Sequence, residues 1–234
     1  MSRKALIIGN NAYSNNSLRS CVYDARDLAG KLNDVGFEVV LKTDLISLEM
    51  YNCIKIFIDS IQPNDFIIFF FAGYGVQWGD QNFLLPCDNE QIESSRDMQR
   101  FAISAQEITN GMAEMNPQAV VVLLDCCREY WVPRTNRNGF QVPRGLAKMD
   151  APPGTLIAFA CASGHTIPAL FSDSKNSTFT KYLLKHITTP DTDIDIILRR
   201  VTRDISIETN NTQKPYRVTA VVEESLYVVS TGRW

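Results

Sequence analysis

The segment 66–75 reads FIIFFFAGYG and decides the fold class of this chain. Its apolar part, 66–72, is the longest apolar run in the sequence, but it is far shorter than the ~20 residues of a membrane-spanning helix. A short β-rich run without alternation is typical of a strand that is covered on both faces. We therefore predict a buried central strand over 66–71, followed by the glycine-flanked Tyr74.

Apolar runs of the same kind alternate with helical patterns along the chain. Strands are predicted at 5–8, 37–41, 66–71, 120–124 and 156–160, with an edge strand at 218–229. Helices are predicted at 22–35, 48–61, 104–115, 178–187 and 194–207. This alternation is typical of a doubly wound α/β fold, in which a mostly parallel sheet carries helices on both faces.

The composition of the 234 residues excludes several classes of protein. With 45% hydrophobic and 21% charged residues, the chain is neither disordered nor a disulfide-stapled mini-protein. A net charge of −3 with scattered Lys and Arg argues against a nucleic-acid or membrane partner. Six cysteines at low density and the absence of a signal-peptide core predict a reduced, cytoplasmic chain. Two histidines without CxxC or HExxH spacing predict no metal, and no cofactor is expected.

Residues 128–153 interrupt the alternation with four prolines and two glycines. A loop of that length inside a compact domain is either functional or disordered. It could instead link two domains, but only about 80 residues follow it. Because 156–160 reads as a further strand of the same sheet, we predict one domain over residues 1–234.

Catalytic groups in a doubly wound sheet gather beyond the carboxyl ends of the parallel strands. Four segments occupy such positions: 9–11, 72–75, 125–128 and 161–165. The third presents Asp125, Cys126, Cys127 and Arg128 in succession. Cys127 is the natural nucleophile, because a strand end can offer exposure and a nearby cation. The alternative is that both cysteines are ordinary buried thiols.

Other doubly wound families match less well. The first strand is not followed by GxGxxG, which argues against dinucleotide binding. A flavodoxin-like or receiver-like fold matches the alternation. A receiver, however, needs clustered acidic residues after the first strand, where this chain has Gly9, Asn10 and Asn11.

Seven segments in a fixed order resemble the caspase-like domain of paracaspases and their bacterial relatives. They read KALIIGN (4–10), DA (24–25), GFEV (36–39), FFAGYGVQ (70–77), FLLPCD (83–88), LDCCR (124–128) and GTLIAFA (154–160). The resemblance implies a caspase-like three-layer sandwich around a six-stranded sheet. It also implies a large-subunit-like part, a linker loop and a small-subunit-like part, over 1–128, 129–153 and 154–234.

The resemblance further implies a cysteine endopeptidase that cuts after Arg or Lys, with a Cys-His dyad at the ends of the third and fourth strands. Cys127 matches the nucleophile of the family's Asp-x-Cys-Arg motif, and Tyr74 stands where its Ala-Gly-His-Gly motif has histidine. These positions lie about 50 residues apart, as in caspases. Asp24 and Asp125 match acidic residues that line the pocket for the basic side chain, and Thr166 stands at a third acidic position.

Tyrosine at position 74 changes the predicted mechanism. A phenol with a pKa near 10 is only ~0.1% ionised at pH 7 and forms no cation beside a thiolate. Loss of the base from such a pair costs on the order of 10⁴ to 10⁶ in rate. We therefore predict a pseudoprotease that keeps Cys127 and the acidic pocket. The alternative is an active Arg/Lys-specific endopeptidase with an unusual base, for which His165 is the candidate.

The predicted partners are a peptide or protein substrate with Arg or Lys, or a caspase-like partner. Caspase-fold domains often dimerise through the last strand, so the apolar edge 216–229 predicts a homodimer or heterodimer. The resemblance also makes four loop residues candidate cut sites during maturation: Arg134, Arg137, Arg144 and Lys148. A solvated loop with incidental basic residues is the alternative.

Overall fold

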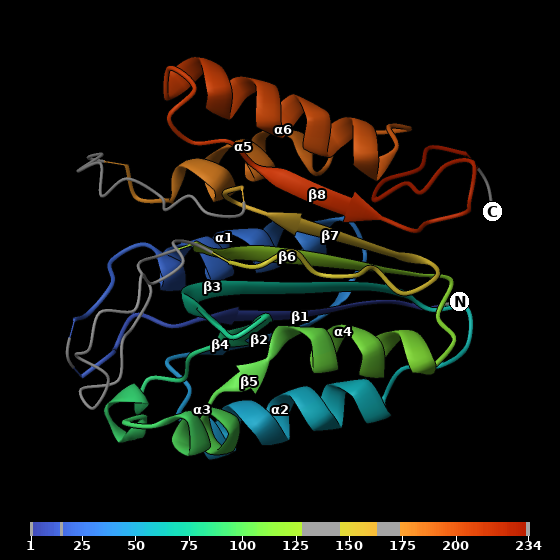
Figure 1. Cartoon of the computed structure of the whole chain (residues 1–234). Coiled ribbons are helices and arrows are strands. Elements are labelled where there is room, and N and C mark those ends of the chain that lie inside the picture. Colours follow the sequence, from blue (N-terminus) through green and yellow to red (C-terminus); the bar gives the residue numbers. More distant parts are fainter. Residues whose placement is uncertain (1, 15, 128–145, 163–173, 233–234) are drawn as a thin grey trace.

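A mostly parallel sheet runs through the structure, with helices on both of its faces (Figure 1). The computed structural model describes residues 2–14, 16–127, 146–162 and 174–232. The strands of this part are β1 Arg3–Gly9, β2 Glu38–Thr43, β3 Phe66–Trp78, β4 Gln81–Leu84, β5 Ile103–Ser104, β6 Ala119–Cys127, β7 Thr155–Phe159 and β8 Tyr216–Thr219. The main strand order is β2-β1-β3-β6-β7-β8, and β8 runs antiparallel to β7. β4 pairs antiparallel with the last four residues of β3, and β5 pairs with β4.

Helices form the two outer layers. Those of the described part are α1 Cys21–Asp34, α2 Ser47–Asp59, α3 Ser95–Phe101, α4 Ala105–Glu114, α5 Thr178–His186 and α6 Ile194–Glu208. The helices α1, α5 and α6 pack on one face of the sheet, and α2 and α4 cover the other (Figure 1). The predicted doubly wound, three-layer fold around a six-stranded main sheet is confirmed. In the part of the chain that the structure describes, no helix is both long and apolar enough for a membrane crossing.

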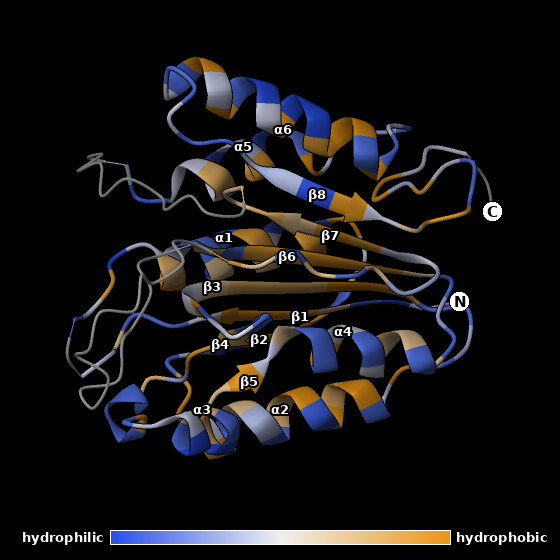
Figure 2. Cartoon of the chain, viewed as in Figure 1, coloured by the Kyte–Doolittle hydropathy of each residue, from blue (hydrophilic) through white to orange (hydrophobic). Residues whose placement is uncertain are grey.

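The central strand β3 divides the core into two apolar clusters. Phe66, Ile68 and Phe70 pack with α1, α5 and α6. Ile67, Phe69 and Phe71 point to the other face and pack with α2 and α4. All of these side chains are at most 2% exposed. Figure 2 shows the hydrophobic colour concentrated on the central strands. Because burying one such side chain contributes roughly 1.5–3 kcal/mol, β3 anchors both helical layers.

Both edges of the sheet differ from the prediction. The side chains of β2 are half-buried or exposed rather than covered on both faces, because β2 is the edge strand of the described sheet. β8 ends at Thr219, where the sequence predicts a strand through 229. Leu226 and Val228 are nevertheless buried in the core. These apolar residues therefore pack in the core from an irregular segment and do not form a strand.

The sequence prediction also missed the structure that follows the central strand. β3 continues to Trp78, well past the predicted end, and turns through Gly79 into β4. Gly79 has φ 59°, a conformation that glycine adopts without the cost of a side chain. Side chains of this hairpin, Val76 and Phe83, pack with Met98 of α3 in a third apolar cluster.

Side-chain caps explain where three helices begin. Ser104 accepts a hydrogen bond from the backbone N–H of Glu107 (3.3 Å) at the start of α4, as is typical of an N-cap serine. Asp193 caps α6 in the same way. Ser177 caps α5 by accepting from the Thr180 N–H (3.0 Å). The N-terminus of α5 is thereby fixed at the carboxyl-end edge of the sheet.

We predict that Gly9→Ala lowers the free energy of unfolding by about 1–3 kcal/mol, because the new methyl group has no space. A Cβ at Gly9 would meet the Cys21 carbonyl oxygen and lie 2.7 Å from the Ala25 Cβ. The matched control is Gly30→Ala in α1, where a Cβ has no atom within 4 Å. That change should stabilise the helix by about 0.5–1 kcal/mol. Urea unfolding measures both, and equal effects would contradict the close approach of β1 and α1.

Candidate functional site

The carboxyl ends of β3 and β6 bring the two predicted dyad positions together. Ala72 pairs with Asp125, but the next paired residues are Gly75 and Cys127, so β3 carries one extra residue here. Tyr74 lies in this β-bulge. Bulges re-aim side chains and are frequent next to active sites. Position 74 is therefore beside the end of the strand that carries Cys127.

The glycines on both sides of Tyr74 pack too closely for any side chain. A Cβ on Gly75 would lie 2.7 Å from the Cys126 Sγ. A Cβ on Gly73 would meet the Tyr13 Oη and lie 2.7 Å from the Phe71 Cζ. The bulge backbone thus packs directly against β6 and against the loop after β1. This packing fixes the point at which the Tyr74 side chain leaves the strand.

Tyr74 is held by a second tyrosine that the sequence analysis did not single out. The Tyr74 N–H donates to the Tyr13 Oη (2.9 Å), and the Tyr13 hydroxyl donates to the Leu85 carbonyl oxygen (3.0 Å). The Leu85 N–H donates back to the Tyr74 carbonyl oxygen (2.9 Å). The two tyrosine rings meet edge to face, with centroids 4.7 Å apart. Tyr74 is thus held by backbone hydrogen bonds and by the packing of its ring on Tyr13.

Tyr13 is a neutral structural group in this arrangement. Its side chain is buried, and burial raises its pKa well above the ordinary value. Tyr13 also belongs to a small apolar cluster beyond the strand ends, against which Tyr74 packs. No local pattern marked Tyr13 in the sequence, because its partners lie 61 and 72 residues away.

The two predicted pocket carboxylates come together from α1 and β6. Asp24 and Asp125 are each 1% exposed. Ser177 bridges them: its backbone N–H donates to Asp24 Oδ1 (3.0 Å), and its hydroxyl donates to Asp125 Oδ2. The Thr180 hydroxyl also donates to Asp125 Oδ2 (2.9 Å). The structure therefore assembles an acidic pair at the N-terminus of α5.

The acidic pair has an unusual titration. Burial, and next the negative charge of Asp125, raise the pKa of Asp24 to about 8, against the smaller lowering effect of the Ser177 N–H. Two buried carboxyls this close resist simultaneous ionisation, so the pair holds a proton near neutral pH. A positively charged ligand would stabilise the ionised carboxylate of Asp24, so the pair would release this proton on binding.

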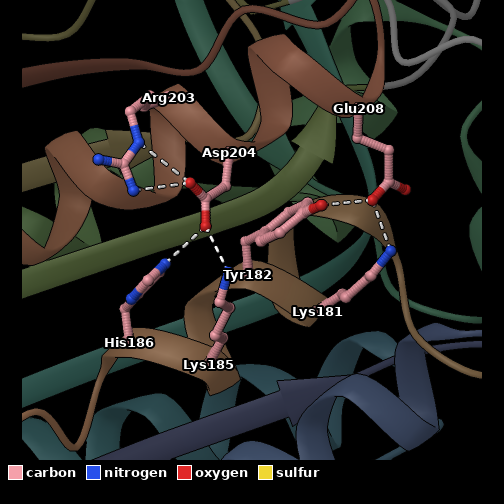
Figure 3. A network of polar contacts seen from close by, with 7 residues as sticks. All are labelled: Lys181, Tyr182, Lys185, His186, Arg203, Asp204 and Glu208. Atoms are coloured by element: carbon pink, nitrogen blue, oxygen red, sulfur yellow. Dashed lines mark hydrogen bonds and ion pairs between the residues drawn. The ribbon is translucent and has the colours of Figure 1, made fainter.

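A polar network fixes the other end of α5 (Figure 3). Asp204 of α6 accepts hydrogen bonds from Lys185 and His186 of α5 and from its neighbour Arg203. These donors, Lys185 first, hold the pKa of Asp204 well below its usual range. Glu208 accepts from two further α5 residues, Lys181 and Tyr182. The helix that carries Ser177 and Thr180 is thereby tied to α6.

His186, the second histidine of the chain, lies in the last turn of α5. Its side chain is 12% exposed, and its Nε2 lies 2.9 Å from Asp204 Oδ2, far along the chain from the dyad positions. In the described part, no group of three or more His, Cys, Asp and Glu side chains is arranged to hold a metal ion.

Several predicted site residues lie outside the described residues. They are Arg128, Thr166 and His165, together with the proposed cut sites Arg134, Arg137 and Arg144. The strand position of Cys127 is described, but its side chain is not. Within the same loop, Lys148 is exposed between the buried Leu146 and Met149. Asn82 holds this segment through two hydrogen bonds to the Ala147 backbone (2.8 and 2.6 Å).

An apolar groove of about 600 Å³ lies elsewhere, between α2 and the segment that runs through α3 into α4. Leu48, Tyr51 and Phe101 line it, with Lys55 and Arg100 among its polar residues. None of the predicted site residues that the structure describes lines this groove. The groove is therefore separate from the predicted site.

A doubly wound sheet that sets a cysteine position beside its partner position, at the ends of adjacent parallel strands, is the architecture of a caspase-like cysteine peptidase homologue. The chain belongs to the caspase domain family, whose model matches residues 2–227. The resemblance inferred from the motifs is confirmed.

Two curated relatives share the domain. Mucosa-associated lymphoid tissue lymphoma translocation protein 1 of Homo sapiens and its homolog of Mus musculus are each 26% identical to this chain over 205 residues. The alignment covers 86% of this chain and 23% of each relative. The chain thus spans less than a quarter of the length of these relatives.

Solved structures agree with the fold. The structure of pro-sf-caspase-1 has a TM-score of 0.70 and 15% identity, and the match covers 99% of this chain and 92% of that chain. Protein GSU0716 from Geobacter sulfurreducens has a TM-score of 0.71 and 15% identity, with both chains covered completely. Identity at this level supports the shared fold alone.

We predict that Asp24→Asn flattens the pH dependence of stability. The unfolded chain loses this proton near pH 3.9, whereas the folded chain keeps it to about pH 8. Rising pH therefore favours the unfolded state across this range, and the stabilisation present below pH 4 is lost as the pH passes 8. Thermal melting at pH 5 and pH 8 should show a fall in the wild type that the variant reduces by at least about 2–4 °C.

The control for this prediction is Asp27→Asn in the same helix, which removes an exposed ion pair to Lys175 (2.8 Å). It should leave the pH dependence close to that of the wild type, because exposed pairs contribute little. Equal pH dependence in Asp24→Asn and the wild type would contradict the buried acidic pair.

Proposed function

We propose that this protein is a caspase-like pseudoprotease that binds basic side chains without cutting the peptide. The observation that carries the proposal is Tyr74 on the β3 bulge, next to the end of β6 where Cys127 stands. In the family motif this position holds the histidine that acts on the cysteine. Tyrosine can pack at this position without changing the fold, but it cannot take the proton of the Cys127 thiol as histidine does.

The chemistry of a phenol supports the loss of proteolysis. A cysteine peptidase needs one group that takes the thiol proton and later protonates the leaving amine, with a pKa near the working pH. The backbone of Tyr74 is tied to Tyr13 and Leu85, and its ring packs on the ring of Tyr13. A neutral aromatic residue held in this way can donate a hydrogen bond at most.

The acidic pair supports the retained binding of Arg or Lys. Two carboxylates at the strand ends offer charge and hydrogen-bond acceptors to a guanidinium or ammonium group. Asp24 and Asp125 are buried together, so their affinity for a cation is not screened by water as at the surface. We therefore assign these two residues to a pocket for a basic side chain.

Such a domain acts through its partners, which we propose to be peptides or proteins with Arg or Lys, or a caspase-like chain. The parts 1–128 and 154–234 would correspond to the two subunits of a caspase, joined by 129–153, and the low cysteine density favours a cytoplasmic setting. The short edge strand β8 is the candidate pairing surface. Light scattering tests this pairing, and a single-chain mass at every concentration would exclude a homodimer.

We predict no turnover of fluorogenic peptides that carry Arg or Lys before the cut, measured with the purified chain. Tyr74→His should create activity, because it restores a base with a pKa near neutrality at the position beside Cys127. The expected gain is at least about 100-fold over the wild type, the low end of the contribution of a general base.

Two further variants control this measurement. Tyr74→Phe removes the hydroxyl without adding a base and should stay inactive. Adding Cys127→Ala to Tyr74→His should abolish the new activity. Robust wild-type turnover that disappears in Cys127→Ala would overturn the pseudoprotease proposal and favour an active endopeptidase with another base. No gain in Tyr74→His would show that more than the base has been lost.

A further inference from the structure

Ser177 makes three contacts that together join the acidic pair to a helix. Its backbone N–H donates to Asp24 Oδ1 and its hydroxyl donates to Asp125 Oδ2. The same hydroxyl oxygen accepts the Thr180 N–H as the cap of α5. One residue thus sets the relative position of two carboxylates that come from α1 and β6.

The remaining oxygen of Asp24, Oδ2, is buried and accepts no well-formed hydrogen bond in the described structure, although the Asn176 and Ser20 side chains lie near enough to lower the pKa of the carboxyl. Asp24 is 1% exposed, so water does not replace the missing partner at the surface. A buried polar atom without a partner is costly and rare, and such an atom at a recognition site marks where a ligand belongs. Asp24 Oδ2 is an acceptor and therefore fits a ligand that donates hydrogen bonds.

We propose that Ser177 is the positioning residue of the basic-side-chain pocket, which holds Asp24 and Asp125 in one arrangement and leaves Asp24 Oδ2 for an incoming guanidinium or ammonium group. This inference rests on the proposed function of the pair as a pocket. The ties between α5 and α6 through Asp204 and Glu208 keep Ser177 in place. The α5 N-terminus adds its positive dipole end, which favours the ionised carboxylates.

Ligand binding exchanges a proton for the cation. In the empty pocket the carboxyl of Asp24 keeps its proton, because burial and Asp125 raise its pKa to about 8. When the cation arrives, the O–H bond breaks, the proton passes to solvent, and the carboxylate accepts an N–H of the ligand. Affinity should therefore rise with pH and level off above about pH 8.

Among the described residues, the elements packed against Asp24 contribute few other charges, and the nearby Ser20 and Asn176 side chains are uncharged. Asp125 of β6 is the charged group that raises the pKa of Asp24 in the described residues. On α1, Asp27 is engaged by Lys175 and by the Asn176 amide, and Cys21 lies one turn from Asp24. On β6, the thiols of Cys126 and Cys127 follow Asp125. Ser177 and Thr180 present uncharged hydroxyls from α5.

The test is binding of acetyl-arginine amide to the full chain by calorimetry between pH 6 and pH 9. Ser177→Ala removes the hydroxyl that donates to Asp125, so the ionised pair loses a stabilising bond. We expect at least about tenfold weaker binding at pH 7, as for a lost hydrogen bond to a charged group. The pH of half-maximal affinity should move upward. Carboxyl ¹³C NMR of Asp24 without ligand should show the same upward shift.

Two variants separate positioning from helix capping. Ser177→Thr keeps a hydroxyl and should restore both the affinity and the pH profile. Ser104→Ala removes the corresponding cap of α4, on the other face of the sheet, and should lower stability without changing cation binding. A Ser177→Ala protein that binds and titrates like the wild type would overturn the role of Ser177 and leave the pocket intact. A wild type that does not bind would overturn the pocket and this inference together.

Discussion

The parallel pairing of β3 with β6 is the interaction on which the rest of the structure depends. The aromatic and aliphatic side chains of β3 fill both apolar clusters, so the position of this strand fixes both helical layers. Its register with β6 holds from Phe66 to Ala72, and the bulge then shifts it by one residue before Gly75. That shift sets Tyr74 beside the end of the strand that carries Cys127. The core and the candidate site are thus determined by one strand pair.

The candidate site places a firmly held tyrosine and a buried acidic pair near the same strand ends. Tyr13 and Leu85 hold the bulge backbone by hydrogen bonds, so a tyrosine at position 74 is accommodated without disturbing the fold. The carboxylates of Asp24 and Asp125 remain buried beside each other, which costs stability at neutral and higher pH. A buried acidic pair is difficult to explain as packing alone. It is easier to explain as the cation receptor that we propose.

The sequence could predict what local pattern and composition determine. Apolar runs predicted the five parallel strands, periodicity predicted five helices, and the strand-end rule singled out Cys127 and its neighbours. The pairing of Asp24 with Asp125 came from the family resemblance, because residues about 100 positions apart share no local pattern. Tyr13 and Ser177 were missed for the same reason: their roles depend on contacts that only the folded chain creates. The edge strand β8 was predicted too long because buried apolar residues occur in irregular segments as well.

The central claim is that no base acts on Cys127, and the reactivity of this thiol tests the claim most directly. Alkylation of Cys127 by iodoacetamide can be followed between pH 5.5 and pH 10 by peptide mass spectrometry. A thiol without a cationic partner should react in a single rise centred near pH 8.5 or above. A reactive plateau that extends to pH 6 and disappears in His165→Ala would show an ion pair at Cys127 and contradict the account.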